Sequence, residues 1–258
     1  MRATSAAFFT STLALTNAIN LDVIYDQIHA KTALELINNP NLSERLSYVK
    51  KEFTLLRERG DYGCWCYFSD DDHEKARGDP VSKMDRICKK LHQGYTCASF
   101  DGEEEISAGT RAVGDECLPW KQSYVPFIPH TSAGTKEEEC ASLNALLGTC
   151  AINTCIIEAQ FAEDFVQFIA STENKRRGIK VKEFTHSMDF DHAAYLAETN
   201  AKNSNNGNGG NGPVDSCCGS YPNRFPYASG RKECCNGRTY SPTMQTCCDD
   251  KVQAIGSC

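Results

Sequence analysis

Fifteen cysteines constrain this chain more than any other feature. The chain has 258 residues, and its 15 cysteines all lie between Cys64 and Cys258. Cytosolic proteins rarely carry so many cysteines without metal-binding clusters, whereas secreted domains use them as disulfide frameworks. We therefore expect a disulfide-stapled protein that folds in an oxidising compartment.

Residues 1–18 are typical of a secretory signal peptide, which leads to the same compartment. Arg2 supplies the positive start, and Ala6 to Leu15 form an apolar stretch that is too short to span a bilayer. Thr16-Asn17-Ala18 offers small residues at the cleavage site. The sequence therefore predicts a secreted, extracellular protein.

An Asn- and Gly-rich run at 203–212 divides the chain into two predicted domains. We place the linker at 196–216, an N-terminal segment at 19–41, a first domain at 42–195 and a cysteine-rich module at 217–258. Eight cysteines precede the linker and seven follow it. Because an even set can close on itself, we expect the leftover thiol in the C-terminal module, either free or paired with another chain.

Apolar residues at steps of three and four predict that the first domain is mainly α. They mark an amphipathic helix at 42–58, a second helical stripe from Met84 to Leu91 and a third helical stretch at 138–170. Strand signals are sparse before the linker. Asn41 is expected to cap the first of these helices, a role that competes with the glycosylation predicted for the Asn41-Leu42-Ser43 sequon.

The net charge of −7 excludes generic nucleic-acid binding by the whole chain. The acid is concentrated in runs at 70–72, 103–105 and 137–139. Calcium takes oxygen ligands, so each run is either a solvated surface or a candidate calcium site, and the run at 70–72 is the best candidate.

The basic cluster Lys175-Arg176-Arg177 is a candidate binding site for sulfated glycans or anionic lipid headgroups. A processing site and a solvated helix end are the alternatives.

Tyr62-Gly63-Cys64-Trp65-Cys66, followed by Gly78-Asp79-Pro80-Val81 and then by Met84-Asp85-Arg86-Ile87-Cys88, resembles the calcium loop and catalytic helix of secreted phospholipase A2. The similarity covers 60–97 and extends more loosely over 42–172. It implies a disulfide-rich, phospholipase A2-like helical domain with a Cys66–Cys88 disulfide. It also implies one Ca²⁺ held by loop carbonyls and a helix aspartate, a histidine base on the helix, and a second carboxylate that orients this histidine.

When the residues of the family motif are aligned one by one with this sequence, the resemblance predicts that the catalytic residues are missing. In an ungapped alignment, Leu91 falls on the position of the histidine base and His92 on that of the calcium-binding aspartate. A leucine cannot transfer a proton, and a histidine is a poor ligand for Ca²⁺. A shift by one residue makes His92 the base but places Gln93 on the aspartate position. We expect His92 to be a partly exposed surface residue, and it is the candidate base if the protein is active.

The loop departs from the family as well. Trp65, Tyr67 and Ser69 fall on positions whose carbonyls bind Ca²⁺, and Tyr67 and Ser69 replace glycines there. The loop is also longer than usual and contains Asp70, Asp71 and Asp72, which are either side-chain calcium candidates or part of a hydrophilic insertion. On the third helical stretch, Glu158 is expected to be a surface acid.

Beyond the linker, three Cys-Cys pairs at 217-218, 234-235 and 247-248 precede Cys258 and resemble galaxin repeats, which are described in extracellular mineral matrices. A segment this short cannot bury a sufficient core, so we expect disulfides to hold it. Adjacent cysteines do not easily bridge each other, so each is expected to reach a different partner. A generic disulfide knot is the alternative interpretation, and the Cys-Cys spacing disfavours zinc.

Two hypotheses of function follow. The first is a non-enzymatic extracellular protein whose partners are matrix or a mineral phase, or a phospholipid surface, and which forms disulfide-linked multimers through the odd cysteine. The second is a calcium-dependent phospholipase A2 with an altered site that uses His92. A lipid- or toxin-like binder without turnover is a third possibility. The Arg-Gly-Asp tripeptides at 59–61 and 77–79 are better explained by chance and by the family motif than by integrin binding.

Overall fold

The computed structural model describes residues 21–59, 61–68, 76, 78–129, 134–171 and 214–258. Several predictions of the sequence lie outside these residues: the signal peptide at 1–18, Ser69 with Asp70-Asp71-Asp72, the basic cluster at 175–177 and the run at 203–212. The described part before the linker is mainly helical and disulfide-rich, as the sequence predicts.

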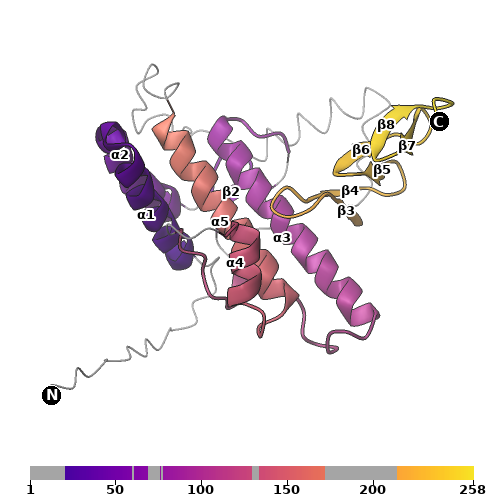
Figure 1. Ribbon diagram of the computed structural model, residues 1–258, viewed down its shortest axis with the longest axis horizontal. Coiled ribbons are helices and arrows are strands. Elements are labelled where there is room, and N and C mark those ends of the chain that lie inside the picture. The colour runs from indigo at the N-terminus through magenta and orange to yellow at the C-terminus, as the bar shows by residue number, and fades with distance from the viewer. Residues whose placement is uncertain (1–20, 60, 69–75, 77, 130–133, 172–213) are drawn as a thin grey trace.

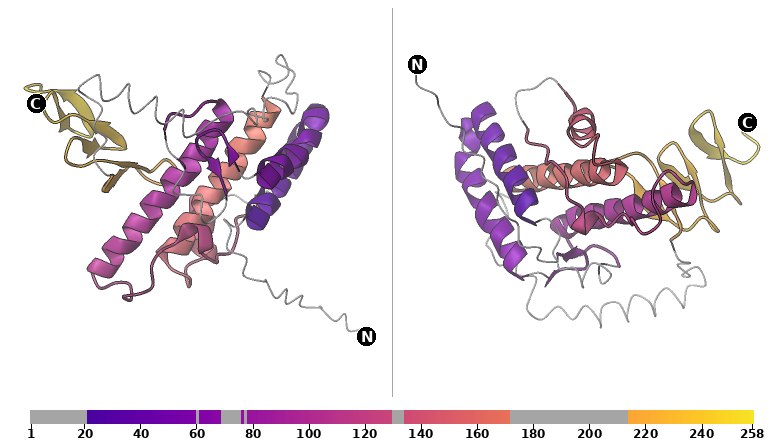
Figure 2. Two further views of the ribbon diagram at one scale, coloured as in Figure 1. Left: turned by 180° about the vertical axis from the view of Figure 1, so that it is seen from behind. Right: turned by 90° about the horizontal axis from the view of Figure 1, so that it is seen from below.

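Two helices, α1 (Leu21–Asn38) and α2 (Ser43–Arg59), lie side by side along one flank of the molecule (Figures 1 and 2). The apolar stripe predicted for the second of them is buried, with Val49 and Phe53 fully enclosed. Helix α1 also packs against α5, so residues of the segment 19–41 contribute to the core of the first domain. Asn41 lies within the short 3₁₀ helix η1 (Pro40–Leu42) that precedes α2, so the prediction that it caps α2 is wrong.

The centre of the domain is the pair α3 (Lys83–Ser107) and α5 (Thr149–Ala170), which cross the molecule next to each other (Figure 1). The helices approach closely at Gly94, where a Cβ atom would stand 3.0 Å from the side chain of Ile157. Most of the remaining buried apolar residues of α5 continue this interface towards α1 and α2. Helix α3 therefore has a wide buried face, because it contacts α5 on one side and the C-terminal strands on another.

The helical stretch predicted at 138–170 is two helices rather than one. Helix α4 (Lys136–Leu143) begins with a capping box formed by Thr135 and Glu138, and α5 begins only after Gly148. The break is fixed by Asn144, whose side-chain amide exchanges hydrogen bonds with the backbone of Val125 at 2.7 and 3.0 Å. Gly148 has a φ of 86°, a conformation that favours glycine.

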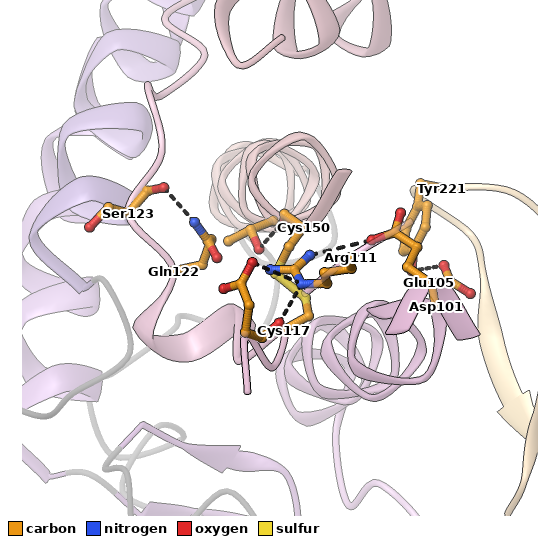
Figure 3. The surroundings of a disulfide bond; sticks show 10 residues. Asp101, Glu105, Arg111, Cys117, Gln122, Ser123, Cys150 and Tyr221 are labelled. Carbon is orange, nitrogen blue, oxygen red and sulfur yellow. Dashed lines mark hydrogen bonds and ion pairs between the residues drawn. A yellow bond between two sulfur atoms is a disulfide. The ribbon is translucent and has the colours of Figure 1, made fainter. Parts of the chain in front are cut away.

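The segment between α3 and α4 is held by two disulfides and an arginine. Cys117 pairs with Cys150 at the start of α5, while Cys140 of α4 pairs with Cys155. Figure 3 shows Arg111 beside the first of these disulfides, where its guanidinium lies 3.3 Å from the Glu105 carboxylate of α3. The 3₁₀ helix η3 (Pro119–Lys121) follows, so the sequence region 99–136 contains the end of α3, a cross-linked loop and the start of α4.

The C-terminal module is a row of three β-hairpins, and the first strand of each hairpin ends in a Cys-Cys pair. The strands are β3 (Ser216–Cys218) with β4 (Phe225–Tyr227), β5 (Glu233–Cys235) with β6 (Arg238–Tyr240), and β7 (Gln245–Cys248) with β8 (Lys251–Ala254). Successive residues of a strand point to opposite faces, so the two cysteines of a pair reach different partners. The second cysteine of each hairpin bonds to the first of the next, or to Cys258 at the end.

The first cysteine of the module, Cys217, forms a disulfide with Cys97 of α3, which contradicts the expected division of the cysteines into two separate sets. The leftover thiol is therefore Cys64 in the first domain, and the prediction that it lies in the C-terminal module is wrong. The module also contacts α3 through Asp101, whose carboxylate accepts hydrogen bonds from Tyr221 and Arg224 at 2.8 Å each. Figures 1 and 2 show the hairpins on the flank of α3, away from α1 and α2.

Candidate functional site

The residues of the phospholipase-like motif come together where a small hairpin meets the start of α3. The hairpin pairs β1 (Asp61–Tyr62) with β2 (Cys66–Tyr67), and the Cys66–Cys88 disulfide, which the resemblance implies, ties it to the helix. Trp65 adds a hydrogen bond from its indole N–H to the Gly78 carbonyl at 2.9 Å. The loop and the helix of the motif are thus fixed to each other covalently and by polar contacts.

Asp85 is the electrostatic centre of this junction. Its carboxylate is fully buried and accepts backbone N–H hydrogen bonds from Cys64, Trp65 and Val81 at 2.7–3.1 Å. Gly63, with a φ of 64°, brings the turn onto this carboxylate so closely that a Cβ atom would lie 2.6 Å from its carbon. The turn therefore presents N–H groups to an acid at this point.

Among the calcium candidates, Trp65 and Tyr67 lie in the described hairpin. The Trp65 carbonyl accepts a hydrogen bond from the Tyr67 N–H at 2.9 Å, and the Tyr67 side chain is buried. Ser69 and Asp70-Asp71-Asp72 lie outside the described residues. Within the described part of the chain, no three acidic, histidine or cysteine side chains group together as metal ligands.

The Cys64 thiol stands in the hairpin turn, beside the Asp85 carboxylate. Its side chain has no exposed surface. Burial, together with the negative charges of Asp85 and Asp79, raises the pKa of the Cys64 thiol to about 12. A thiol in this environment remains protonated at neutral pH and is a poor nucleophile.

Leu91 and His92 are both buried in the middle of α3. Leu91 is 1% exposed and belongs to the main apolar core. His92 is 5% exposed, so the expectation of a partly exposed surface histidine is wrong. Its ring centroid lies 6.3 Å from that of Trp65 and 6.4 Å from that of Tyr95, which shows that α3 buries His92 among aromatic side chains of the hairpin and of its own next turn.

Glu158 of α5 is fully buried, so the prediction of a surface acid is wrong. It accepts hydrogen bonds from two tyrosine hydroxyls: that of Tyr95 on α3, at 2.6 Å, and that of Tyr124 from the segment before α4. Burial raises the pKa of Glu158 to about 8, although the two hydroxyls act in the opposite direction. Burial and the neighbouring carboxyl also raise the pKa of both tyrosines well above the usual value.

This arrangement limits the chemistry that the motif can perform. Tyr95 stands one helical turn after Leu91, so the two share one face of α3 and Leu91 occupies the position next to the tyrosine–carboxyl pair. At neutral pH, the raised pKa keeps Glu158 largely protonated. The position at which the resemblance places the histidine base thus carries an alkyl side chain, next to a hydrogen-bond network of one carboxyl and two tyrosine hydroxyls.

The sequence could not reveal the Glu158 network, because its members lie 63 and 34 residues apart along the chain. The available signal is that Glu158 directly follows Ile156 and Ile157 and precedes Ala159. No family model, curated protein or solved structure matches this chain. None of the helices in the described part of the chain is long and apolar enough to cross a membrane.

Proposed function

We propose that this chain is an extracellular binding protein that does not hydrolyse phospholipids, built on a phospholipase A2-like scaffold. The observation that supports the proposal is Leu91, a buried apolar side chain at the position where the resemblance places the histidine base. A general base must present a lone pair within hydrogen-bond reach of the attacking water, and leucine has none. Secretion, which the predicted signal peptide and the seven disulfides favour, is part of the proposal.

The proposed role is to present surfaces held in fixed positions by the disulfides. The Cys97–Cys217 bond and the Asp101 contacts join the galaxin-like hairpins to α3, so both parts of the molecule would meet a matrix or mineral partner together. Assembly through intermolecular disulfides stays a prediction. Its expected route through a spare C-terminal cysteine is closed, because all seven cysteines of that module are paired.

The second candidate is a calcium-dependent phospholipase A2 in which His92 acts as the base. The one observation in favour of this candidate is that His92 is a titratable group next to the Leu91 position. However, His92 is only 5% exposed, which leaves little room for a substrate ester and a water. The calcium ligands of this candidate would have to come from the hairpin carbonyls and from Asp70-Asp71-Asp72.

A paired assay separates these two functions. Oxidised wild-type protein and His92→Ala are incubated with phosphatidylcholine vesicles in millimolar calcium, and released fatty acid is quantified. The proposal predicts no release above the protein-free control from either protein. Calcium-dependent release by wild type that His92→Ala abolishes, with near-ultraviolet circular dichroism unchanged, would contradict the proposal and support the second candidate.

A further inference from the structure

A cavity of about 190 Å³ opens where α1, α5, the start of α4 and the segment before α4 meet. One part of its wall is apolar and comes from Phe127, Pro129 and two alanines of α5, Ala159 and Ala162. The volume corresponds to roughly six waters, at about 30 Å³ each. The cavity can therefore hold a short apolar chain, and it is smaller than a site for a drug-sized ligand.

Gln27 of α1 lines this cavity with a polar group that has no partner among the described residues. The residue is 1% exposed, yet neither the nitrogen nor the oxygen of its side-chain amide makes a hydrogen bond there. Buried side-chain amides in native proteins are nearly always hydrogen-bonded, and each exception calls for an explanation, such as strain or a water or ion bound to it. The amide thus indicates a polar group that binds in the cavity.

Two ammonium groups also line the cavity and converge on one carboxylate. Lys31 lies 3.6 Å and Lys136 lies 2.6 Å from the oxygens of Glu163. Each lysine side chain is only 17% exposed. Glu35 contacts Lys31 as well, at 3.1 Å, and the Lys136 ammonium also donates to the side-chain oxygen of Gln160, so each ammonium has two protein partners.

The Glu163 carboxylate keeps its charge at neutral pH. Burial raises the pKa of Glu163, but the ammonium groups of Lys136 and Lys31 outweigh that effect and hold it below the usual value. Each ammonium has three N–H donors, and Lys31 stands one helical turn after Gln27 on the same face of α1. Both lysines can thus turn an N–H toward a ligand that also meets the Gln27 amide.

We propose that this cavity binds a short-chain fatty acid, with its carboxylate between Lys31, Lys136 and the Gln27 amide and its alkyl chain against the apolar wall. The two ammonium groups and the amide supply charge-assisted hydrogen bonds to the carboxylate oxygens. The site uses no residue of the phospholipase-like motif, so it does not depend on the proposed function.

Isothermal titration of the full-length, oxidised protein with hexanoate tests the proposal, with hexanamide as the uncharged ligand of the same shape. We expect hexanoate to bind at a one-to-one ratio and at least about ten-fold more tightly than hexanamide. Lys136→Gln removes one ammonium and is expected to weaken hexanoate binding about ten-fold. Lys90→Gln is the matched control, because Lys90 also pairs with a carboxylate of α5, Asp164 at 3.0 Å, but lies outside the cavity lining.

Gln27→Leu provides an independent readout. It replaces the unpaired amide with an apolar group of similar size, so we expect a higher melting temperature without ligand together with hexanoate binding weakened about ten-fold or more. The proposal is overturned if wild type binds no hexanoate at millimolar concentration, or binds hexanamide equally well. It is also overturned if folded Gln27→Leu or Lys136→Gln retains the wild-type affinity, or if Lys90→Gln loses as much affinity as Lys136→Gln.

Discussion

At the scale of single residues, the buried carboxyl of Glu158 couples the fold to pH. Its pKa is raised to about 8, because burial disfavours the charged form more than the hydroxyls of Tyr95 and Tyr124 favour it. The unfolded chain loses this proton near the ordinary glutamate value of 4.5. Between these two values the folded state binds more protons than the unfolded state, so Glu158 lowers the free energy of unfolding as the pH rises.

We predict that Glu158→Gln flattens this dependence. Glutamine keeps the size of the side chain and the tyrosine contacts but has no proton to lose. The wild-type free energy of unfolding should fall between pH 5 and 8 by up to about 1.4 kcal/mol per pH unit from this group, and the variant should lose that slope. Urea unfolding across the pH range measures this slope. Glu105→Gln is the control, because Glu105 is a half-buried carboxylate in an ion pair with Arg111. A wild-type slope retained in Glu158→Gln would contradict the assignment.

Asp85 is predicted to matter for stability through the hairpin turn. Asn at this position replaces one acceptor oxygen with an N–H₂ group that faces backbone N–H donors. We expect Asp85→Asn to lower the free energy of unfolding by about 3 kcal/mol, because buried donors lose charged partners. Asp22 forms an ion pair with Arg57, and the Asp22 side chain is 73% exposed. Asp22→Asn should therefore lower the free energy of unfolding by less than about 1 kcal/mol. Equal losses in the two variants, measured by urea unfolding, would show that the Asp85 network contributes little.

Cys64 should behave as a concealed thiol. Its burial and raised pKa predict that iodoacetamide does not label the native, non-reduced protein at pH 8. In denaturant without reductant, one cysteine should become labelled, and peptide mapping should place the label on Cys64. Rapid labelling of the native protein, or a label on a cysteine of the C-terminal module, would mean that the disulfide pattern differs.

At the scale of secondary-structure elements, periodicity predicts the helices but not their polar contacts. The helix expected at 42–58 is α2, displaced by one residue, and the stripe at Met84 to Leu91 is the first half of α3. Apolar spacing identifies a buried face, yet it assigns polar residues within that face to the surface. The expectations for His92 and Glu158 are wrong for this reason, since Trp65, which packs beside His92, and the two hydroxyls that bond to Glu158 come from other elements.

The break between α4 and α5 shows the same limit. The residues from Asn144 to Gly148 contain no proline, and their leucines continue the apolar composition, so the sequence favours one helix. Asn144 ends α4 because its amide bonds to Val125, a contact with a distant segment. In contrast, the sequence does predict that the cysteines of each Cys-Cys pair take different partners, because adjacent cysteines do not easily bridge each other, and the disulfides confirm this.

At the scale of the whole molecule, a series of disulfides runs from α3 to the C-terminus. It begins at Cys97–Cys217 and continues through the three hairpins to Cys248–Cys258. The number of cysteines on each side of the linker does not predict the Cys97–Cys217 bond. An even or odd count locates the leftover thiol only if no disulfide crosses the linker. The covalent bond means that the linker does not set the distance between the module and α3.

We predict that the Cys97→Ser, Cys217→Ser double variant releases this constraint. The hairpins keep their own disulfides, whereas docking then depends on the contacts of Asp101 with Tyr221 and Arg224. Loss of a disulfide that closes a long loop should cost about 2–4 kcal/mol of stability. Small-angle X-ray scattering should show a larger radius of gyration, and thermal melting a lower midpoint. An unchanged radius and midpoint would indicate that noncovalent docking suffices.

The measurement that tests the central claim most directly is hydrolysis of phosphatidylcholine by the wild-type protein, in millimolar calcium and in chelator. Disulfide mapping first confirms the oxidised state, and mass spectrometry then quantifies lysophospholipid and fatty acid over a long incubation. Because the resemblance places Leu91 at the position of the base, we predict that product formation equals that of the protein-free control in both conditions. Calcium-dependent formation of both products would contradict this and assign the fold to a working hydrolase.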